Sequence, residues 1–140
     1  KLEGAGLLTT MRLAVANAAR SLESVDYINA HGPSDVFIDQ METRMIKNAF
    51  GPHAYHIPIT SIKGATGNPM GCGGVHQFIS TALTIQKSVI PPTTNFETPG
   101  EDCDLDYVPG KPRMNRVRCA LINSHGFGRG NVCMVLEPVL

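Results

Sequence analysis

The chain has 140 residues, enough for one domain, and its 12 basic and 12 acidic residues give a formal net charge of zero, which argues against a general nucleic-acid binder. Hydrophobic residues make up 42% and charged residues 17%, so the chain can bury a core and is not a disordered chain. No apolar run approaches the roughly 20 residues that span a bilayer, and the first residues lack the apolar stretch of a signal peptide.

Hydrophobic periodicity predicts helices that alternate with strands along the chain. Helices are expected at Leu8–Leu22, Asp39–Phe50 and about Gly71–Ser88, and strands at Val25–Ala30, Ile57–Ile62, Arg118–Ser124 and Val132–Glu137. Glycines at 64, 67, 71, 73 and 74 predict a loop, and residues 91–112 are expected to be irregular with a strand-like patch at Asp106–Val108. The order indicates an α/β fold, a mixed β-sheet with helices on both faces, formed as one domain by residues 1–140.

Two of these helices carry expectations about burial. The first is expected to bury a stripe of apolar residues at helical spacing: Met11, Leu13, Ala14, Ala18 and Ala19. The third is apolar on most of its faces, so it is expected to be buried on several sides.

The four cysteines are Cys72, Cys103, Cys119 and Cys133, and none forms a Cys-x-x-Cys pair. A zinc knuckle is therefore disfavoured, and no metal site is expected. Sparse cysteines in apolar or glycine-rich surroundings are typical of buried, reduced thiols in a cytoplasmic protein.

Three predicted strands end in polar residues followed by glycine. The first runs into His31-Gly32, the second into Lys63-Gly64, and the third into Ser124-His125-Gly126. In α/β proteins, active-site groups often lie just past the carboxyl ends of strands. We expect these three strand ends to converge on one pocket.

Five motifs, in chain order, resemble the signatures of the β-ketoacyl-acyl carrier protein synthases. They are Val25–Gly32, Ser61–Gly67, Pro91–Asn95, Cys103–Pro109 and Asn123–Gly128. The likeness runs from about Leu7 to Glu137, and the order of five motifs makes it specific. It covers the C-terminal half of such an enzyme and implies half of a thiolase-like fold, in which two similar α/β halves are joined.

The resemblance implies that the nucleophilic cysteine belongs to the N-terminal half, because none of the four cysteines here matches it. The chain also does not begin with a methionine. It is therefore expected to be the later part of a longer protein or one subunit of a split one. Its expected partners are an N-terminal half or companion ketoacyl synthase subunit, in a dimeric assembly, and acyl carrier protein. No cofactor is expected; the substrates are carried on the phosphopantetheine of acyl carrier protein.

The family reaction is a decarboxylative Claisen condensation of an acyl and a malonyl thioester, as in fatty acid or polyketide biosynthesis. The resemblance assigns His31 as a hydrogen-bond donor through Nε2 to the thioester oxygen. Lys63 would organise the surrounding network together with Glu42. Phe127 would be the gating aromatic.

Several positions depart from the family pattern at the same site. Asn68 stands in place of a second catalytic histidine and is expected to act as a catalytic residue; its amide can donate a hydrogen bond but cannot take up a proton or a positive charge. Ser34 and Asp35 lie where the family contacts the phosphopantetheine arm, and His125 replaces an aromatic. We expect these three residues to contact substrate. Two further departures are Gln77 in place of a glutamate, and Pro33 in place of a threonine.

Two other functions compete with the catalytic one. Asn68, Pro33 and His125 favour a non-catalytic partner similar to a chain-length factor. A nucleotide-binding loop at Gly126–Gly130 is disfavoured, because the segment after it is strand-like rather than helical.

A basic stretch near the C-terminus suggests where a carrier docks. It contains Lys111, Arg113, Arg116, Arg118 and Arg129. Acyl carrier proteins are acidic, and complementary charge speeds association. We hypothesise that some of these residues contact the carrier.

Overall fold

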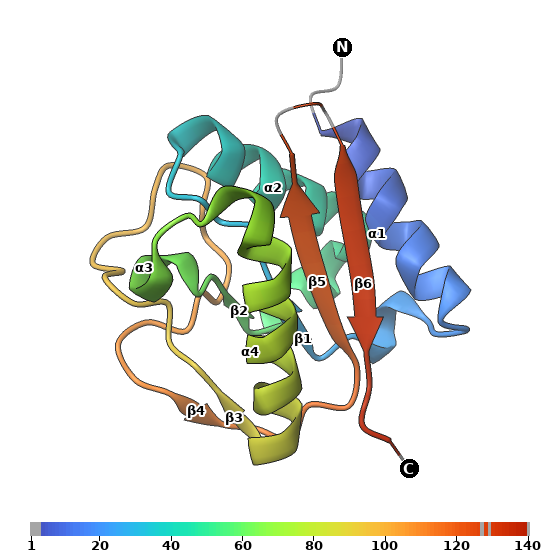
Figure 1. Ribbon diagram of the computed structural model, residues 1–140. Helices are drawn as coiled ribbons and strands as arrows, with labels where there is room; N and C mark the ends of the chain where they lie inside the picture. The colour runs from blue at the N-terminus through green and yellow to red at the C-terminus, as the bar shows by residue number, and fades with distance from the viewer. Residues whose placement is uncertain (1–3, 127, 129, 140) are drawn as a thin grey trace.

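The computed structural model describes residues 4–126, 128 and 130–139, arranged around a four-stranded sheet (Figure 1). The strand order is β2 (Ile59–Thr60), β1 (Tyr27–Asn29), β5 (Ala120–His125) and β6 (Asn131–Leu136). β1 runs parallel to both β2 and β5, whereas β6 is antiparallel to β5. The carboxyl ends of the three parallel strands therefore lie at one edge of the sheet.

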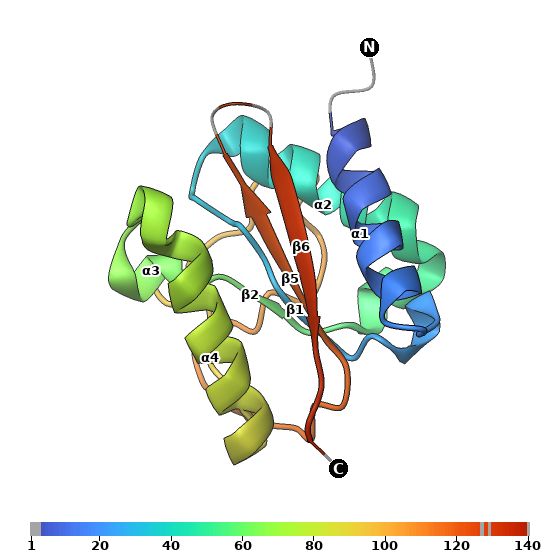
Figure 2. The same ribbon diagram turned by 45° about the vertical axis from the view of Figure 1, so that its right-hand side comes forward.

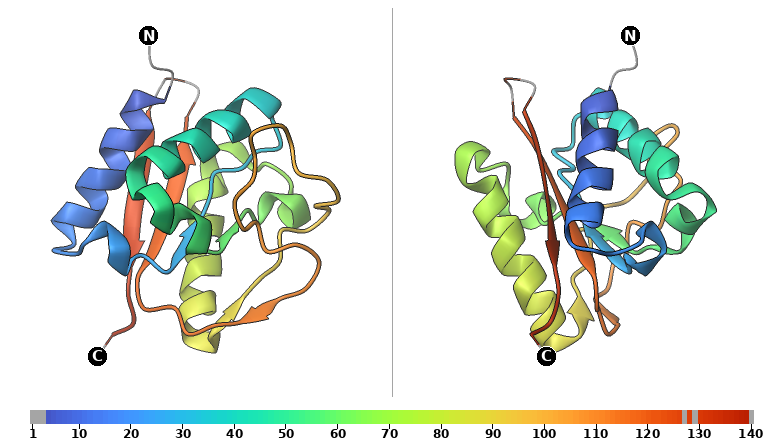
Figure 3. Two further views of the ribbon diagram at one scale, coloured as in Figure 1. Left: turned by 180° about the vertical axis from the view of Figure 1, so that it is seen from behind. Right: turned by 90° about the vertical axis from the view of Figure 1, so that its right-hand side faces the viewer.

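Helices cover both faces of this sheet. α1 (Ala5–Asn17) and α2 (Val36–Phe50) lie on one face, and α4 (Gly73–Lys87) lies on the other (Figure 2). The views in Figure 3 show the same three layers from behind and from the side. The predicted α/β architecture, a mixed sheet with helices on both faces, is confirmed.

The main hydrophobic core lies between the sheet and the α1–α2 layer. α1 contributes Leu7, Met11 and Val15, which are at most 1% exposed and follow one another at intervals of four residues. The stripe predicted for this helix was wrong in part. Leu13 is 56% exposed, and the helix ends before Ala18 and Ala19 because the backbone of Ala19 turns to a positive φ of 53°.

α4 is buried in the opposite way from the prediction. Its sheet-facing side is polar and carries the buried residues Gln77, Thr81 and Thr84. Four of its large apolar residues are 47–59% exposed: Val75, Phe78, Ile79 and Leu83. The expected burial on several sides is therefore wrong within the described chain, because the helix contacts the sheet mainly through this polar side, joined by the partly buried Ile85.

The connections differ from the expected loops. α2 begins three residues early because the Asp35 side chain caps it, accepting a hydrogen bond from the Ile38 N–H at 3.0 Å. The glycine-rich segment contains α3 (Lys63–Thr66) and a 3₁₀ turn, η3 (Met70–Cys72). Two further 3₁₀ segments are η1 (Leu22–Ser24) and η2 (Gly51–His56).

A second, two-stranded sheet was missed by the sequence reasoning: β3 (Val89–Ile90) pairs with β4 (Arg113–Met114). The predicted patch at Asp106–Val108 is not a strand, since Val108 has a φ of 48°. This segment instead covers the edge of β2, where the Ile59 N–H donates to the Asp106 carbonyl at 2.8 Å.

All four cysteines are free thiols, but only Cys119 is buried. Cys72 is exposed, against expectation, because it lies at the surface where α4 begins. None of the helices in the described part of the chain is long and apolar enough to cross a bilayer.

Gly64 joins α3 to the segment after β3. A Cβ at this position would lie 2.2 Å from the Thr94 carbonyl oxygen, and the Asn95 side chain donates to the Gly64 carbonyl at 2.9 Å. Gly64→Ala is therefore expected to lower the free energy of unfolding by about 1–3 kcal/mol, measured by urea denaturation. Gly71→Ala is the control, because a methyl group there meets open space; it should change stability by less than about 0.5 kcal/mol. Equal effects of the two substitutions would contradict this contact.

Candidate active site

Three residues meet at the sheet edge where the parallel strands end. His31 follows β1, Lys63 begins α3 just after β2, and His125 ends β5. Lys63 Nζ lies 3.2 Å from His31 Nδ1 and also donates to the His31 carbonyl oxygen. The rings of His31 and His125 meet edge to face, with centroids 4.7 Å apart and planes at 78°. The predicted convergence of the three strand ends is confirmed.

The hydrogen bonds of His31 determine which ring nitrogen carries its proton. The backbone N–H of His125 donates to His31 Nδ1 at 3.2 Å, and Lys63 Nζ, which has donors only, faces the same atom. Nδ1 is therefore an acceptor, and the neutral ring carries its proton on Nε2. Burial, together with the positive charge of Lys63, lowers the pKa of His31 to about 3. His31 is thus a neutral hydrogen-bond donor through Nε2.

Lys63 is 7% exposed. Burial lowers the pKa of Lys63, while the carboxylates of Glu42 and Asp39 act in the opposite direction. The negative charges of these two carboxylates therefore favour the protonated lysine, whose ammonium is directed at the His31 ring and backbone.

Glu42 holds the chain turn that carries His31. Its carboxylate accepts hydrogen bonds from the backbone N–H groups of His31 and Gly32, each at 2.9 Å, and from Asn123 Nδ2 at 3.1 Å. Glu42 is 3% exposed, so these charge-assisted bonds form away from water. No ion pair joins Glu42 to Lys63 within residues 4–126, so Glu42 acts on the lysine through its charge and on the rest of the site through its hydrogen bonds.

Gln77 links α4 to the ends of β1 and β5 by hydrogen bonds. Its Nε2 donates to the carbonyls of Ala30 and Asn123, both at 2.8 Å. The Asn29 side chain in turn donates to the Gln77 carbonyl at 3.2 Å and to Thr81 Oγ1 at 3.1 Å. The bonds fall on residues directly before His31 and two before His125. Sequence reasoning noted Gln77 only as a departure from a motif, and it missed the positioning contacts of Asn123 and Asn29.

The remaining predicted site residues do not contact His31 or Lys63 by hydrogen bonds in the described structure. Ser34 is exposed with a φ of 67°, and Asp35 is occupied as the cap of α2, so their contact with substrate stays a prediction. Asn68 is exposed between α3 and η3 and forms no hydrogen bond with His31 or Lys63 in the described structure. Its catalytic role also stays a prediction. Phe127 and Arg129 lie outside the described residues.

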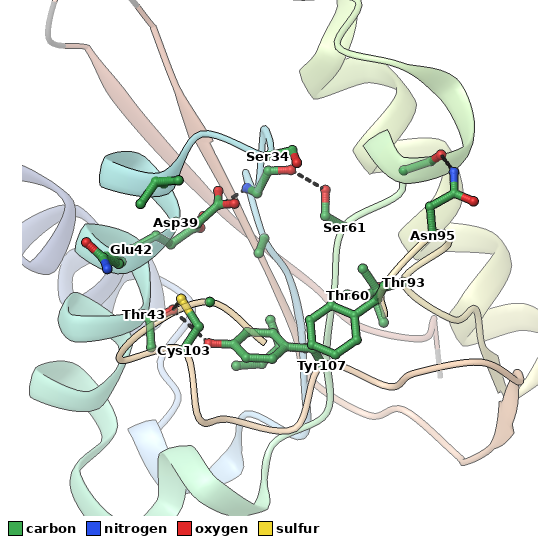
Figure 4. Close-up of a pocket in the computed structure, with 18 of the residues that line it drawn as sticks. Ser34, Asp39, Glu42, Thr43, Thr60, Ser61, Thr93, Asn95, Cys103 and Tyr107 are labelled. Atoms are coloured by element: carbon green, nitrogen blue, oxygen red, sulfur yellow. Dashed lines mark hydrogen bonds between the residues drawn. The ribbon is translucent and has the colours of Figure 1, made fainter. Parts of the chain in front are cut away.

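A cavity of about 330 Å³ lies beside this cluster, between α2 and the segment after β3 (Figure 4). Asp39, one helical turn before Glu42, lines it, and burial together with the charges of Glu42 and Asp35 raises the Asp39 pKa to about 6. One turn further along α2, Thr43 Oγ1 is hydrogen-bonded to Tyr107 Oη at 2.7 Å. Sequence reasoning missed Asp39, although its spacing of three residues from Glu42 places both carboxylates on one helix face.

Comparisons with known proteins agree with this geometry. A family model described as the C-terminal domain of beta-ketoacyl synthase matches residues 1–97. The 3-oxoacyl-[acyl-carrier-protein] synthase 2 of Coxiella burnetii is 41% identical over 98% of this chain, and the match covers 33% of that protein. A putative polyketide beta-ketoacyl synthase 1 of Streptomyces virginiae is 42% identical over 96% of this chain and 32% of its own length.

Solved structures also match nearly all of this chain and about a third of their own length. A type II polyketide ketosynthase in complex with its acyl-carrier protein aligns with a TM-score of 0.96 at 33% identity, over 100% of this chain and 34% of the other. The ishigamide ketosynthase/chain length factor aligns with a TM-score of 0.93 at 29% identity, over 98% of this chain and 34% of the other. The chain thus spans about a third of the length of the proteins it resembles.

The environment of His31 predicts how its ring titrates. The ring is expected to stay neutral from pH 8 to about pH 4 and to be half protonated near pH 3, whereas free histidine in the same buffer titrates near 6.5. NMR titration of the ring C–H resonances measures this midpoint. A midpoint near 6.5 for His31 would contradict the buried, Lys63-facing geometry.

The same shift predicts a direction for stability. Because the folded pKa lies below the unfolded one, the unfolded state binds the extra proton, and the His31 contribution to stability is lost as the pH falls from about 6.5 toward 3. Asp39 acts in the opposite direction between about pH 4 and 6, since its folded pKa is raised. The free energy of unfolding of wild type and of Asp39→Asn, measured by urea denaturation between pH 3 and 7, separates the two contributions. The variant should lack the loss of stability that Asp39 causes as the pH rises from about 4 to 6.

Proposed function

Because the chain belongs to the family of beta-ketoacyl synthase C-terminal domains, we propose that it supplies the decarboxylating part of a condensing site in fatty acid or polyketide synthesis. In this reaction a malonyl thioester loses carbon dioxide, and the electron pair of the broken C–C bond moves onto the thioester enolate. The enolate carbon attacks an acyl thioester, whose thiolate leaves, and a 3-oxoacyl thioester results.

The observation that carries this proposal is that the contacts of His31 fix which ring nitrogen accepts and which donates a hydrogen bond. Its Nδ1 accepts from the His125 N–H, so Nε2–H is free to donate to an oxygen on which negative charge develops. A donor fixed in advance toward such an oxygen lowers the barrier, because no reorganisation is needed during the reaction. The nearby charge of Lys63 stabilises the enolate further.

The nucleophile is proposed to come from outside this chain. Burial raises the pKa of the Cys119 thiol, and it raises that of Cys133 to about 12, which disfavours thiolate at either position. Among the described residues no cysteine hydrogen-bonds to His31 or Lys63. A cysteine-bearing half of similar fold would supply the acyl thioester.

The exposed face of α4 supports an additional half. Val75, Phe78, Ile79 and Leu83 leave a wide apolar surface on this helix, and Ile79 and Leu83 line an open groove of about 710 Å³ with Pro91 and Pro92. An apolar surface of this kind marks an interaction site. We place the cysteine-bearing half there, which also accounts for the length of the relatives.

Acyl carrier protein is the proposed donor of both substrates, held on its phosphopantetheine arm without a bound cofactor. Of the basic residues suggested for docking, Arg113 is paired with Asp106, with one bond at 3.0 Å, which reduces its use for a partner. The exposed Lys111, Arg116 and Arg118 remain as the candidates for the acidic carrier. A dimeric assembly and a cytoplasmic location stay predictions.

A non-catalytic role as a chain-length-factor-like partner is the second candidate. The observation that favours it is that Asn68, where the family pattern has a histidine, is exposed and forms no hydrogen bond with His31 in the described structure. Both candidates assemble with a ketosynthase half, so only activity distinguishes them.

Carbon dioxide release from malonyl carrier protein tests the catalytic proposal. The chain assembled with a cysteine-bearing half should release carbon dioxide, and His31→Ala should lower the rate by about 10²-fold or more through loss of the oxyanion donor. His56→Ala, an exposed histidine in η2, is the control and should retain the wild-type rate. A correctly assembled complex that releases none would favour the non-catalytic role.

The α4 surface gives a separate prediction about assembly. Leu83→Glu should leave the chain folded, since the side chain is 48% exposed, but should prevent association with the cysteine-bearing half in sedimentation or size-exclusion measurements. Thr9→Glu makes the same charge change on the exposed side of α1 and should assemble normally. Assembly of the Leu83 variant with wild-type affinity would exclude this face as the interface.

A further inference from the structure

His125 presents a buried hydrogen-bond acceptor that the proposed decarboxylation does not use. Its Nδ1 lies 2.8 Å from Asn131 Oδ1, across the last pair of residues in the β5–β6 register, next to the connection between the two strands. An amide oxygen only accepts, so the Nδ1 of His125 carries the proton and its Nε2 is the bare nitrogen. This Nε2 is buried and has no hydrogen-bond partner among the residues that the structure describes.

The two imidazoles of the site therefore have opposite polarity. His31 accepts at Nδ1 and donates at Nε2, whereas His125 donates at Nδ1 and accepts at Nε2. Their ring centroids are only 4.7 Å apart, so a ligand group held by the His31 ring would lie next to the His125 ring. Such a ligand would have a carbonyl oxygen for His31 and, a few bonds away, an N–H or O–H for His125.

We propose that His125 is a specificity-determining residue, whose Nε2 accepts a hydrogen bond from the amide N–H nearest the thioester on the carrier arm. This proposal rests on the proposed function, in which His31 donates to the thioester oxygen. In a phosphopantetheine thioester, the carbonyl carbon and this amide nitrogen are separated by the sulfur and two methylene groups. The spacing suits two rings in edge-to-face contact.

The local chemistry explains why an acceptor is needed at this position. Pro33 has no side-chain donor or acceptor, and Asp35 is occupied in capping α2, so neither is free for the arm. A buried acceptor without a partner is unfavourable, and a ligand N–H would satisfy it. A ligand that lacks the N–H would leave Nε2 unpaired, so the site should bind an amide-containing arm more tightly than an analogue without the N–H.

Binding of two unreactive thioesters tests this proposal without relying on decarboxylation. The first is S-acetyl-N-acetylcysteamine, and the second is its ester isostere, the acetyl thioester of 2-mercaptoethyl acetate, in which oxygen replaces the amide N–H. Titrations of the full chain followed by NMR of the histidine rings should give about tenfold tighter binding of the amide. In His125→Phe the two ligands should bind equally, while His56→Phe should retain the wild-type ratio.

Equal affinities in wild type, discrimination that persists in His125→Phe, or no binding of either ligand would each overturn the proposal. The position of the His125 ring proton, read from ¹⁵N shifts of the wild-type chain, gives a second test that needs no variant. A proton on Nδ1 supports the proposal, and a proton on Nε2 overturns it. Neither test measures carbon dioxide release. A protein without decarboxylating activity can therefore still support this proposal, and the two proposals can fail separately.

Discussion

The carboxylate of Glu42 is the contact on which the geometry of this site depends. It accepts three N–H donors in a buried setting, from the turn after β1 and from the Asn123 side chain on β5. One carboxylate on α2 therefore fixes the two strand ends that bring His31 and His125 together. Both of its oxygens are needed, because three buried donors without an acceptor would each incur a desolvation cost. On the other face of the sheet, Gln77 holds the residues just before those strand ends.

Much of the fold could be predicted from the sequence, since its long elements have clear periodicity. The helices ending at Phe50 and Lys87 and the paired strands β5 and β6 were all expected within a few residues. The burial of α4 could not be predicted, because its polar inner face is stabilised by hydrogen bonds to strands distant in sequence. The pairing of β3 with β4 was also missed, since two-residue strands carry no periodic pattern.

For the candidate site, polar residues before a glycine at three strand ends were enough to predict that His31, Lys63 and His125 meet. The particular bonds were not predictable, because they depend on which side chain points across the sheet edge. Glu42 was expected to act with Lys63, but its hydrogen bonds to backbone N–H groups were not foreseen, and Asp39 lines a cavity that no motif indicated. Membership of the family agrees with this arrangement, and the departures expected from the sequence at His125 and Asn68 stay predictions.

The central claim is that His31 is a neutral donor whose proton lies on Nε2 because Nδ1 faces the His125 N–H and Lys63. Long-range ¹H–¹⁵N NMR on histidine-labelled protein at neutral pH measures the protonation of each ring nitrogen. A protonated Nε2 and a bare Nδ1 are predicted for His31. A proton on Nδ1 would contradict the claim, since it would place a donor against two donors and leave Nε2 unable to stabilise an oxyanion.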